Sequence, residues 1–155
     1  MIKRLNLKKL TFVSICYNDP GISITYKSLE PFLRSGSQHI IQNGGDSISQ
    51  EEFCLSKLYE EEDTGIYNAI NKAVLRVETE YFMLIHAGDT IIGKPSEIDE
   101  LITNLDTTKS DLSLNNQLIG SRPHNSNLWR PWMLNFGVQP PHLPTIYRAS
   151  VFQCI

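Results

Sequence analysis

One carboxylate of the chain stands where a metal ligand could be useful. Asp89 follows the apolar run 80–85, which is typical of a buried strand, and His86, Ala87 and Gly88 separate the two. Mg²⁺ and Mn²⁺ usually take one or two protein carboxylates together with phosphate oxygens. A Gly-Asp pair is also common in turns that bind nothing. The residues alone leave both interpretations open, a cation ligand and a turn residue.

Polar loops also follow the first two apolar runs of the chain. Residues 10–17 lead into the turn residues 18–21, Asn-Asp-Pro-Gly, and residues 39–42 lead into 43–46, Asn-Gly-Gly-Asp. The two glycines of the second loop permit a close backbone approach or a turn with positive φ. Cys16 falls inside the first run and is expected to be buried and inert.

The predicted elements bring these loops to one edge of a sheet. Nearly continuous apolar runs predict strands at residues 10–17, 39–42 and 80–85. Apolar residues at spacings of three and four predict helices over 22–33, 66–77 and 98–105. The β-α-β order predicts a parallel sheet flanked by helices, and such sheets bind ligands at the carboxyl ends of their strands.

Some boundaries are predicted from local signals. Asp63 or Thr64 could cap the helix 66–77, and Ser96 with Asp99 resembles a capping box for the third helix.

Weaker patterns cover the remainder of the chain. Residues 90–93 suggest a short strand and 111–114 an edge strand. Segment 120–144 holds five of the eight prolines and both tryptophans, so we expect it to be irregular and to border a cleft.

Length and charge restrict the classes of function. A chain of 155 residues suits a single domain, and 14 Lys and Arg against 17 Asp and Glu give a net charge of −3. The absence of a long basic run argues against a nucleic-acid partner. Three cysteines without CxxC spacing, no membrane-spanning stretch and no signal cleavage site favour a cytoplasmic protein.

Five segments, in order, resemble motifs of the inverting glycosyltransferases of family two. Residues 62–73, EDTGIYNAINKA, resemble the E-x-D-x-G-I-Y-D-A-M-N-K-G stretch of that family. Residues 82–89, FMLIHAGD, resemble F-L-N-A-G-D, the family's metal-binding aspartate motif. The other matches are VSICYN at 13–18 with S-I-I-T-Y-N, IIQNGG at 40–45 with I-I-V-D-G-G, and PHLPTIYR at 141–148 with H-Q-A-T-F-Y-R.

The resemblance implies a fold and an activity. The fold would be α/β and GT-A-like (Rossmann-like), a single nucleotide-sugar-binding domain over 1–155 with a mostly parallel sheet flanked by helices. The activity would be inverting transfer of a sugar, from a donor that we expect to be UDP-linked, to a glycan or lipid-linked acceptor in cell-surface polysaccharide synthesis. A divalent cation, Mn²⁺ or Mg²⁺, would act as Lewis acid on the leaving diphosphate.

The resemblance also implies roles for particular residues. Asp89 would bind the metal, and His86 and His142 are further candidates near the metal or the diphosphate. The side chains expected around the donor nucleotide are Tyr17, Asn18, Asn43, Asp63, Asn71 and Lys72. Asn18 could instead begin a turn, and Asn71 and Lys72 could be ordinary helix-surface residues.

The chain departs from the family pattern at several points. Asn43 stands where the family usually has Asp, and His86 where Asn or Asp is common. The family usually continues beyond the last matching segment into a region that carries an Asp general base, which would take the acceptor's proton. No residue of this chain is assigned that role.

Two other classes of function therefore remain as alternatives to a glycosyltransferase. A truncated, non-catalytic nucleotide-sugar-binding module would share the fold and lack turnover. A doubly wound phosphate-binding regulator would usually carry GxGxxG or GxxxxGK[ST] after the first strand, and neither motif is present. Peripheral membrane association and homo-oligomer formation stay open.

Overall fold

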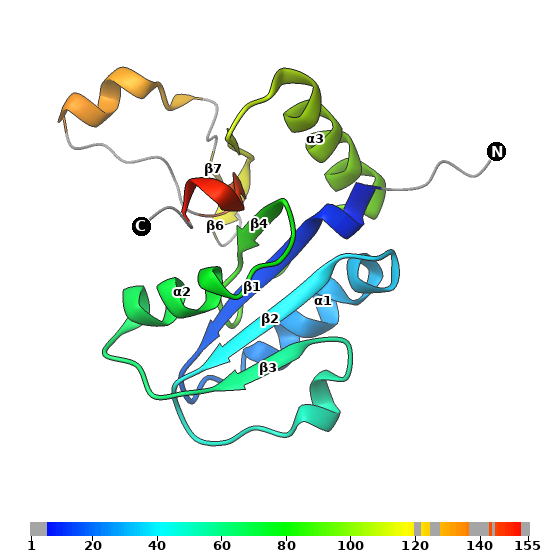
Figure 1. The fold of residues 1–155 in the computed structure, drawn as a ribbon, viewed down its shortest axis with the longest axis vertical. Coiled ribbons are helices and arrows are strands. Elements are labelled where there is room, and N and C mark those ends of the chain that lie inside the picture. Colours follow the sequence, from blue (N-terminus) through cyan, green and yellow to red (C-terminus); the bar gives the residue numbers. More distant parts are fainter. Residues whose placement is uncertain (1–5, 120–121, 125–127, 137–142, 144, 153–155) are drawn as a thin grey trace.

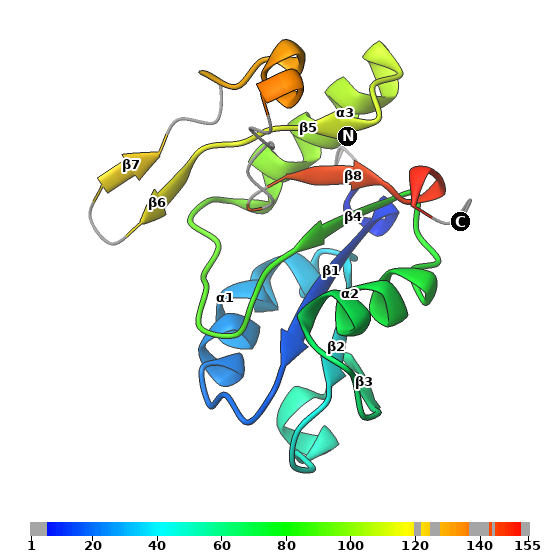
Figure 2. The same ribbon diagram turned by 90° about the vertical axis from the view of Figure 1, so that its left-hand side faces the viewer.

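The computed structural model describes residues 6–119, 122–124, 128–136, 143 and 145–152, and a six-stranded sheet forms its centre. The strands lie side by side in the order β3 (Lys57–Glu60), β2 (Gln38–Asn43), β1 (Leu10–Cys16), β4 (Tyr81–Leu84), β8 (Ile146–Arg148) and β5 (Leu112–Ser113). The first four are parallel (Figure 1), and β8, which is labelled in Figure 2, is antiparallel to both of its neighbours. The predicted α/β fold with a mostly parallel, helix-flanked sheet is therefore confirmed.

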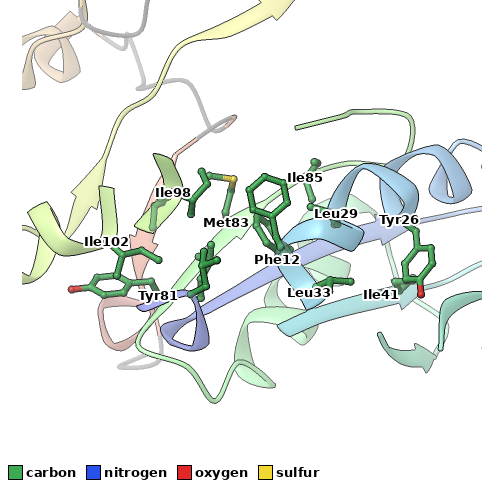
Figure 3. Packing of buried hydrophobic residues seen from close by; sticks show 14 of the residues in the cluster. Phe12, Tyr26, Leu29, Leu33, Ile41, Tyr81, Met83, Ile85, Ile98 and Ile102 are labelled. Atoms are coloured by element: carbon green, nitrogen blue, oxygen red, sulfur yellow. The ribbon is translucent and has the colours of Figure 1, made fainter. Parts of the chain in front are cut away.

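Helices cover both faces of this sheet (Figure 2). α1 (Ile22–Arg34) and α3 (Pro95–Thr108) pack on one face, and α2 (Ile66–Leu75) packs on the other. Alternate residues of the strands therefore enter different apolar layers. Phe12 packs with the α1 and α3 side (Figure 3), whereas its neighbour Val13 packs with α2. Burial of both strand faces explains the continuous apolar runs in the sequence.

Shorter elements complete the described chain. They are the 3₁₀ helices η1 (Asn6–Lys9), η2 (Gln50–Phe53), η4 (Pro131–Phe136) and η5 (Ala149–Val151), and a separate two-stranded sheet of β6 (Gln117–Ile119) and β7 (Arg122–His124). No helix in the described ranges is both long enough and apolar enough to cross a bilayer.

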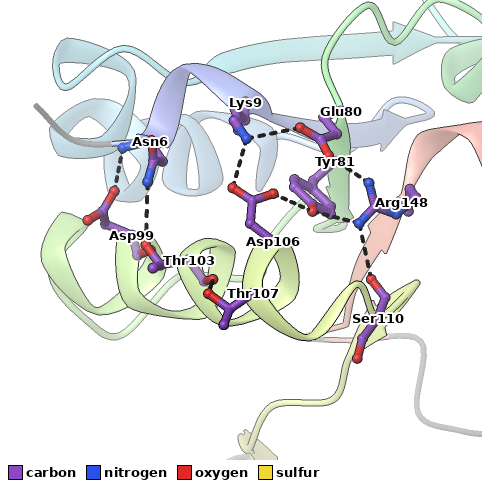
Figure 4. A network of polar contacts seen from close by, with 10 residues as sticks. All are labelled: Asn6, Lys9, Glu80, Tyr81, Asp99, Thr103, Asp106, Thr107, Ser110 and Arg148. Carbon is purple, nitrogen blue, oxygen red and sulfur yellow. Dashed lines mark hydrogen bonds and ion pairs between the residues drawn. The ribbon is translucent and has the colours of Figure 1, made fainter.

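A polar network fastens α3 to the amino-terminal end of β4 (Figure 4). The Lys9 ammonium lies 2.7 Å from a carboxylate oxygen of Asp106 and 3.1 Å from one of Glu80. The Tyr81 hydroxyl donates to Asp106 at 2.7 Å and accepts a hydrogen bond from Arg148 at 2.9 Å. Burial opposes the ionisation of Asp106, yet the hydrogen bonds from Lys9 and Tyr81 hold its pKa below the ordinary value.

Both predicted helix caps were wrong, although α2 begins at residue 66 as predicted. α3 begins at Pro95, and the Glu97 carboxylate accepts the backbone N–H of Lys94 at 2.7 Å. Asp99, predicted to belong to the capping box, is instead buried and accepts the backbone N–H of Asn6. α2 begins after Gly65, and no side chain caps it.

The strands showed two further differences. Residues 90–93 form no strand, because the backbone N–H of Ile91 donates to the hydroxyl of Ser28 at 3.3 Å rather than to a sheet. Edge strand β3 was missed because its four residues, KLYE, are only partly apolar, with exposed ends and a half-buried middle pair. The edge strand predicted at 111–114 is present as β5, which forms the edge of the sheet opposite to β3.

Candidate functional site

A cleft opens at the carboxyl ends of β1 and β4, where the chain order of the sheet changes direction. From β1 the chain passes through α1 to β2 on one side, whereas β4 lies on the other side of β1. Open α/β sheets bind ligands at such switch points. The cleft has a volume of about 520 Å³, within the usual range for small-molecule sites. Its described lining consists of Ile15, Tyr17, Asp19, Asp63, Gly65, Ile66, His86 and Ala87.

Three segments distant in sequence supply this lining. The loop after β1 contributes Tyr17, whose side chain is 68% exposed and free to meet a ligand. The segment before α2 contributes Asp63, and the loop after β4 contributes the half-buried His86. The structure therefore brings together three of the predicted site residues.

Asn18 and Asn43 hold the loops beside the cleft. Asn18 has a positive φ of 51°, and its side-chain oxygen accepts the backbone N–H of Asp46 at 2.6 Å. Asn43 is fully buried, donates to the carbonyl of Asp46 at 2.7 Å and accepts from the N–H of Gly45 at 3.2 Å. The Asn18 amide therefore joins the loop after β1 to the loop after β2, and the Asn43 amide closes the second loop on itself.

The two glycines of the second loop are explained by close approach. A Cβ at Gly45 would lie 2.2 Å from the side-chain oxygen of Asn18, and one at Gly44 would lie 1.9 Å from a carboxylate oxygen of Asp63. Neither glycine has a positive φ, so of the two sequence interpretations the structure shows the close approach.

Lys72 and Asn71 lie on α2, outside the cleft lining. The Lys72 ammonium donates to the carbonyl of Glu62 at 2.7 Å and pairs with the Glu61 carboxylate at 2.8 Å. Because Glu62 immediately precedes Asp63, Lys72 fixes the backbone from which the Asp63 side chain projects. Asn71 is exposed on the helix surface.

The loop after β4 presents Asp89 to solvent. Its carboxylate makes no hydrogen bond or ion pair with the described residues, and its backbone N–H donates to the carbonyl of His86 at 3.0 Å. Within the described ranges no cluster of three or more metal-type ligands is present. The arrangement fits a cation that binds one protein carboxylate and takes its other ligands from substrate phosphates and water, as Mg²⁺ commonly does. His142 lies outside the described residues.

Two lining residues were not among the sequence candidates. Asp19 was assigned only to the turn after the first strand, and Ile66 only to a core-facing helix stripe. Ile66 is 51% exposed at the first turn of α2, where it forms an apolar wall of the cleft. Its position at the helix start, before the buried stripe begins at Ala69, is the signal that could have separated it from the core.

No family model matches the chain, and no curated protein is similar to it. Solved structures do share its fold. S. aureus TarS 1–349 in complex with UDP-GlcNAc is similar with a TM-score of 0.71 at 16% identity, over 94% of this chain and 46% of that one. The mannosyltransferase PcManGT of Pyrobaculum calidifontis, in complex with GDP-Man and Mn²⁺, gives 0.57 at 15% identity, over 70% and 36%.

A nucleotide-using enzyme of another type shares the fold as well. CMP:2-keto-3-deoxy-manno-octonic acid synthetase complexed with CTP gives a TM-score of 0.52 at 12% identity, over 94% of this chain and 76% of that one. The chain thus spans less than half the length of the TarS and mannosyltransferase structures. These similarities establish that the chain has a GT-A-like α/β fold.

Proposed function

We propose that this chain is the donor-binding domain of a glycosyltransferase that uses a nucleotide sugar. The observation that carries the proposal is the cleft at the β1–β4 switch point, bounded by Tyr17, Asp63 and His86. Solved proteins of the same fold hold UDP-GlcNAc or GDP-Man. We further propose a UDP-linked donor, an inverting reaction and a glycan or lipid-linked acceptor in cell-surface polysaccharide synthesis, on the motif resemblance.

Different side chains of the cleft would contact different parts of the donor. The exposed ring of Tyr17 offers a stacking surface for the base. The Asp63 carboxylate can accept hydrogen bonds from a pyrimidine N–H or a ribose hydroxyl. Asn18 and Lys72 would hold the segments that carry these two groups, and Asn43 would shape the loop after β2 on which Asn18 rests.

The charge of the cleft supports a cation. Its described lining contains the carboxylates of Asp19 and Asp63 and includes no lysine or arginine, so a diphosphate there would lack a protein counter-charge. Asp89 would hold Mn²⁺ or Mg²⁺, with His86 on the same loop as a further candidate ligand. When bound, the cation would neutralise charge on the leaving diphosphate.

Calorimetric titration tests the proposal. We expect UDP to bind more tightly with Mn²⁺ than with EDTA, and Asp89→Asn to abolish that difference while leaving the EDTA affinity unchanged. Glu100→Gln, at an exposed position of α3, is the charge-matched control and should behave as the parent. Absence of UDP and GDP binding with Mn²⁺ would contradict the proposal.

Turnover distinguishes an enzyme from a binding module. Donor hydrolysis or transfer is measured with UDP-GlcNAc and GDP-mannose, with and without Mn²⁺. Release of the nucleoside diphosphate supports the transferase, and binding without release under all acceptors supports the non-catalytic module. Consumption of CTP with release of pyrophosphate would point to nucleotidyl transfer and overturn the proposal.

A further inference from the structure

The Asp89 loop begins with a tight turn of defined type. The N–H of Asp89 donates to the carbonyl of His86 at 3.0 Å, and Gly88, the third residue of the turn, has φ of +90°. A positive φ at this position is the mark of a type II turn and requires glycine or asparagine. The turn fixes the backbone of Asp89 relative to β4.

A buried hydroxyl from another element lies at the centre of this turn. Thr25, on α1, is fully buried, and its Oγ1 lies 2.8 Å from the carbonyl oxygen of Asp89 and 3.1 Å from that of His86. The same oxygen accepts the N–H of Gly88 at 3.0 Å. A hydroxyl has one proton and two lone pairs, so these contacts use its donor and engage its acceptor capacity.

Gly21, the residue just before α1, and Ser28, on α1, also meet the loop. A Cβ at Gly21 would lie 2.8 Å from the Cα and the N of Gly88, so only glycine allows this approach. The Ser28 hydroxyl donates to the carbonyl of Thr25 at 2.7 Å and accepts the N–H of Ile91 at 3.3 Å. Residues 21, 25 and 28 recur at helical spacing and form one continuous seat for the loop.

We propose that Thr25 is the positioning residue of the cation site, holding the Asp89 turn against α1 so that the carboxylate keeps a fixed place on the loop whose residues His86 and Ala87 line the cleft. This inference rests on the proposed function, in which Asp89 binds the cation. Thr25 itself touches neither cation nor nucleotide. Groups of this kind, which fix a metal ligand from behind, commonly change metal affinity by roughly 10- to 100-fold when they are removed.

Three variants separate positioning from general stability. Thr25→Val removes the hydroxyl at nearly constant shape, and Thr25→Ser keeps it. Thr11→Val is the matched control. Thr11 is fully buried, and its hydroxyl is hydrogen-bonded to that of Thr79 at 2.6 Å. It lies near the amino-terminal end of β1, whereas the cleft lies at the carboxyl end. Thr25→Val and Thr11→Val should both lower the melting temperature, so melting alone does not decide.

The first readout is amide hydrogen exchange of the ligand-free protein. We expect the Gly88 N–H to exchange at least roughly tenfold faster in Thr25→Val, because its acceptor is gone, and at the parent rate in Thr25→Ser and Thr11→Val. Unchanged exchange of Gly88 in Thr25→Val would overturn the proposal.

The second readout is UDP affinity with and without Mn²⁺. We expect Thr25→Val to lose roughly 10- to 100-fold of the Mn²⁺-dependent gain in affinity, with the EDTA affinity unchanged and Thr25→Ser close to the parent. A full Mn²⁺ gain in Thr25→Val would overturn the positioning role. If Mn²⁺ does not raise the UDP affinity of the parent protein, the cation site of the proposed function is wrong. The exchange experiment uses neither UDP nor Mn²⁺, so its result is independent of that outcome.

Discussion

Gly44 and Asp63 come so close that no side chain fits between them. A Cβ at residue 44 would lie 1.9 Å from the Asp63 carboxylate, far inside any normal contact. The loop after β2 therefore packs directly against the Asp63 carboxylate, which lines the cleft. Gly44, which is half-buried, thus leaves room for a side chain 19 residues further along the chain.

Substituting this glycine should displace Asp63. We expect Gly44→Ala to lower the free energy of unfolding by about 1–3 kcal/mol and to weaken UDP binding. In the Asp63→Ala background the same substitution should cost much less, since the clashing carboxylate is absent. Urea denaturation of the four proteins of this cycle measures the coupling, and equal costs in both backgrounds would contradict it.

Tyr17 should contribute to nucleotide affinity through its ring. Tyr17→Ala removes the exposed stacking surface, and we expect UDP binding to weaken by about 1–3 kcal/mol. Tyr17→Phe keeps the ring and should bind nearly as the parent does. Because Tyr17 is 68% exposed, neither variant should change the melting temperature appreciably. Equal affinity of the Ala and Phe variants, measured by calorimetry, would exclude stacking.

The elements around the cleft could be predicted from sequence because they are buried on both faces. The strand predicted at 10–17 ends one residue earlier as β1, and the helix predicted at 22–33 matches α1 within one residue. Edge strand β3 could not be predicted, since its pairing with β2 rather than its own apolar content defines it.

The site itself could be predicted only as separate loops. Motifs predicted three of the cleft residues, namely Tyr17, Asp63 and His86. The hydrogen bond that holds the Asp89 turn comes from Thr25, which is 64 residues away in the sequence. In sequence Thr25 reads as one more member of a core-facing helix stripe, and nothing local reveals its hydrogen-bond partners. Such long-range polar contacts depend on the packing of α1 against the loop.

The network around Asp106 should matter more than an exposed ion pair. Asp106→Asn removes the charge that faces Lys9 and leaves one side-chain oxygen where two accept hydrogen bonds, one from Lys9 and one from Tyr81, and we expect a loss of about 1–2 kcal/mol in unfolding free energy. Glu30→Gln is the control, because its pair with Arg34 lies on the surface and should contribute less than about 0.5 kcal/mol. Similar losses in both variants, from urea denaturation, would show that the network adds nothing.

His39 should make the fold sensitive to mild acid. It is almost wholly buried between two serines, with ring nitrogens 2.7 Å from the Ser56 hydroxyl and 2.9 Å from that of Ser14. Burial lowers the pKa of His39 to about 3, against about 6.5 in the unfolded chain. Between these values the unfolded state binds a proton that the native state does not, so stability is complete above pH 6.5 and falls as the pH decreases.

From pH 6.5 to pH 5, where most carboxylates are still ionised, the loss from His39 should reach about 2 kcal/mol. Urea denaturation across this interval measures the slope. His39→Gln cannot take up the proton, so we expect its stability at pH 7 to be lower but its slope in this interval to be much flatter. A parent protein whose unfolding free energy is constant from pH 6.5 to pH 5 would show that His39 is protonated without cost in the folded state.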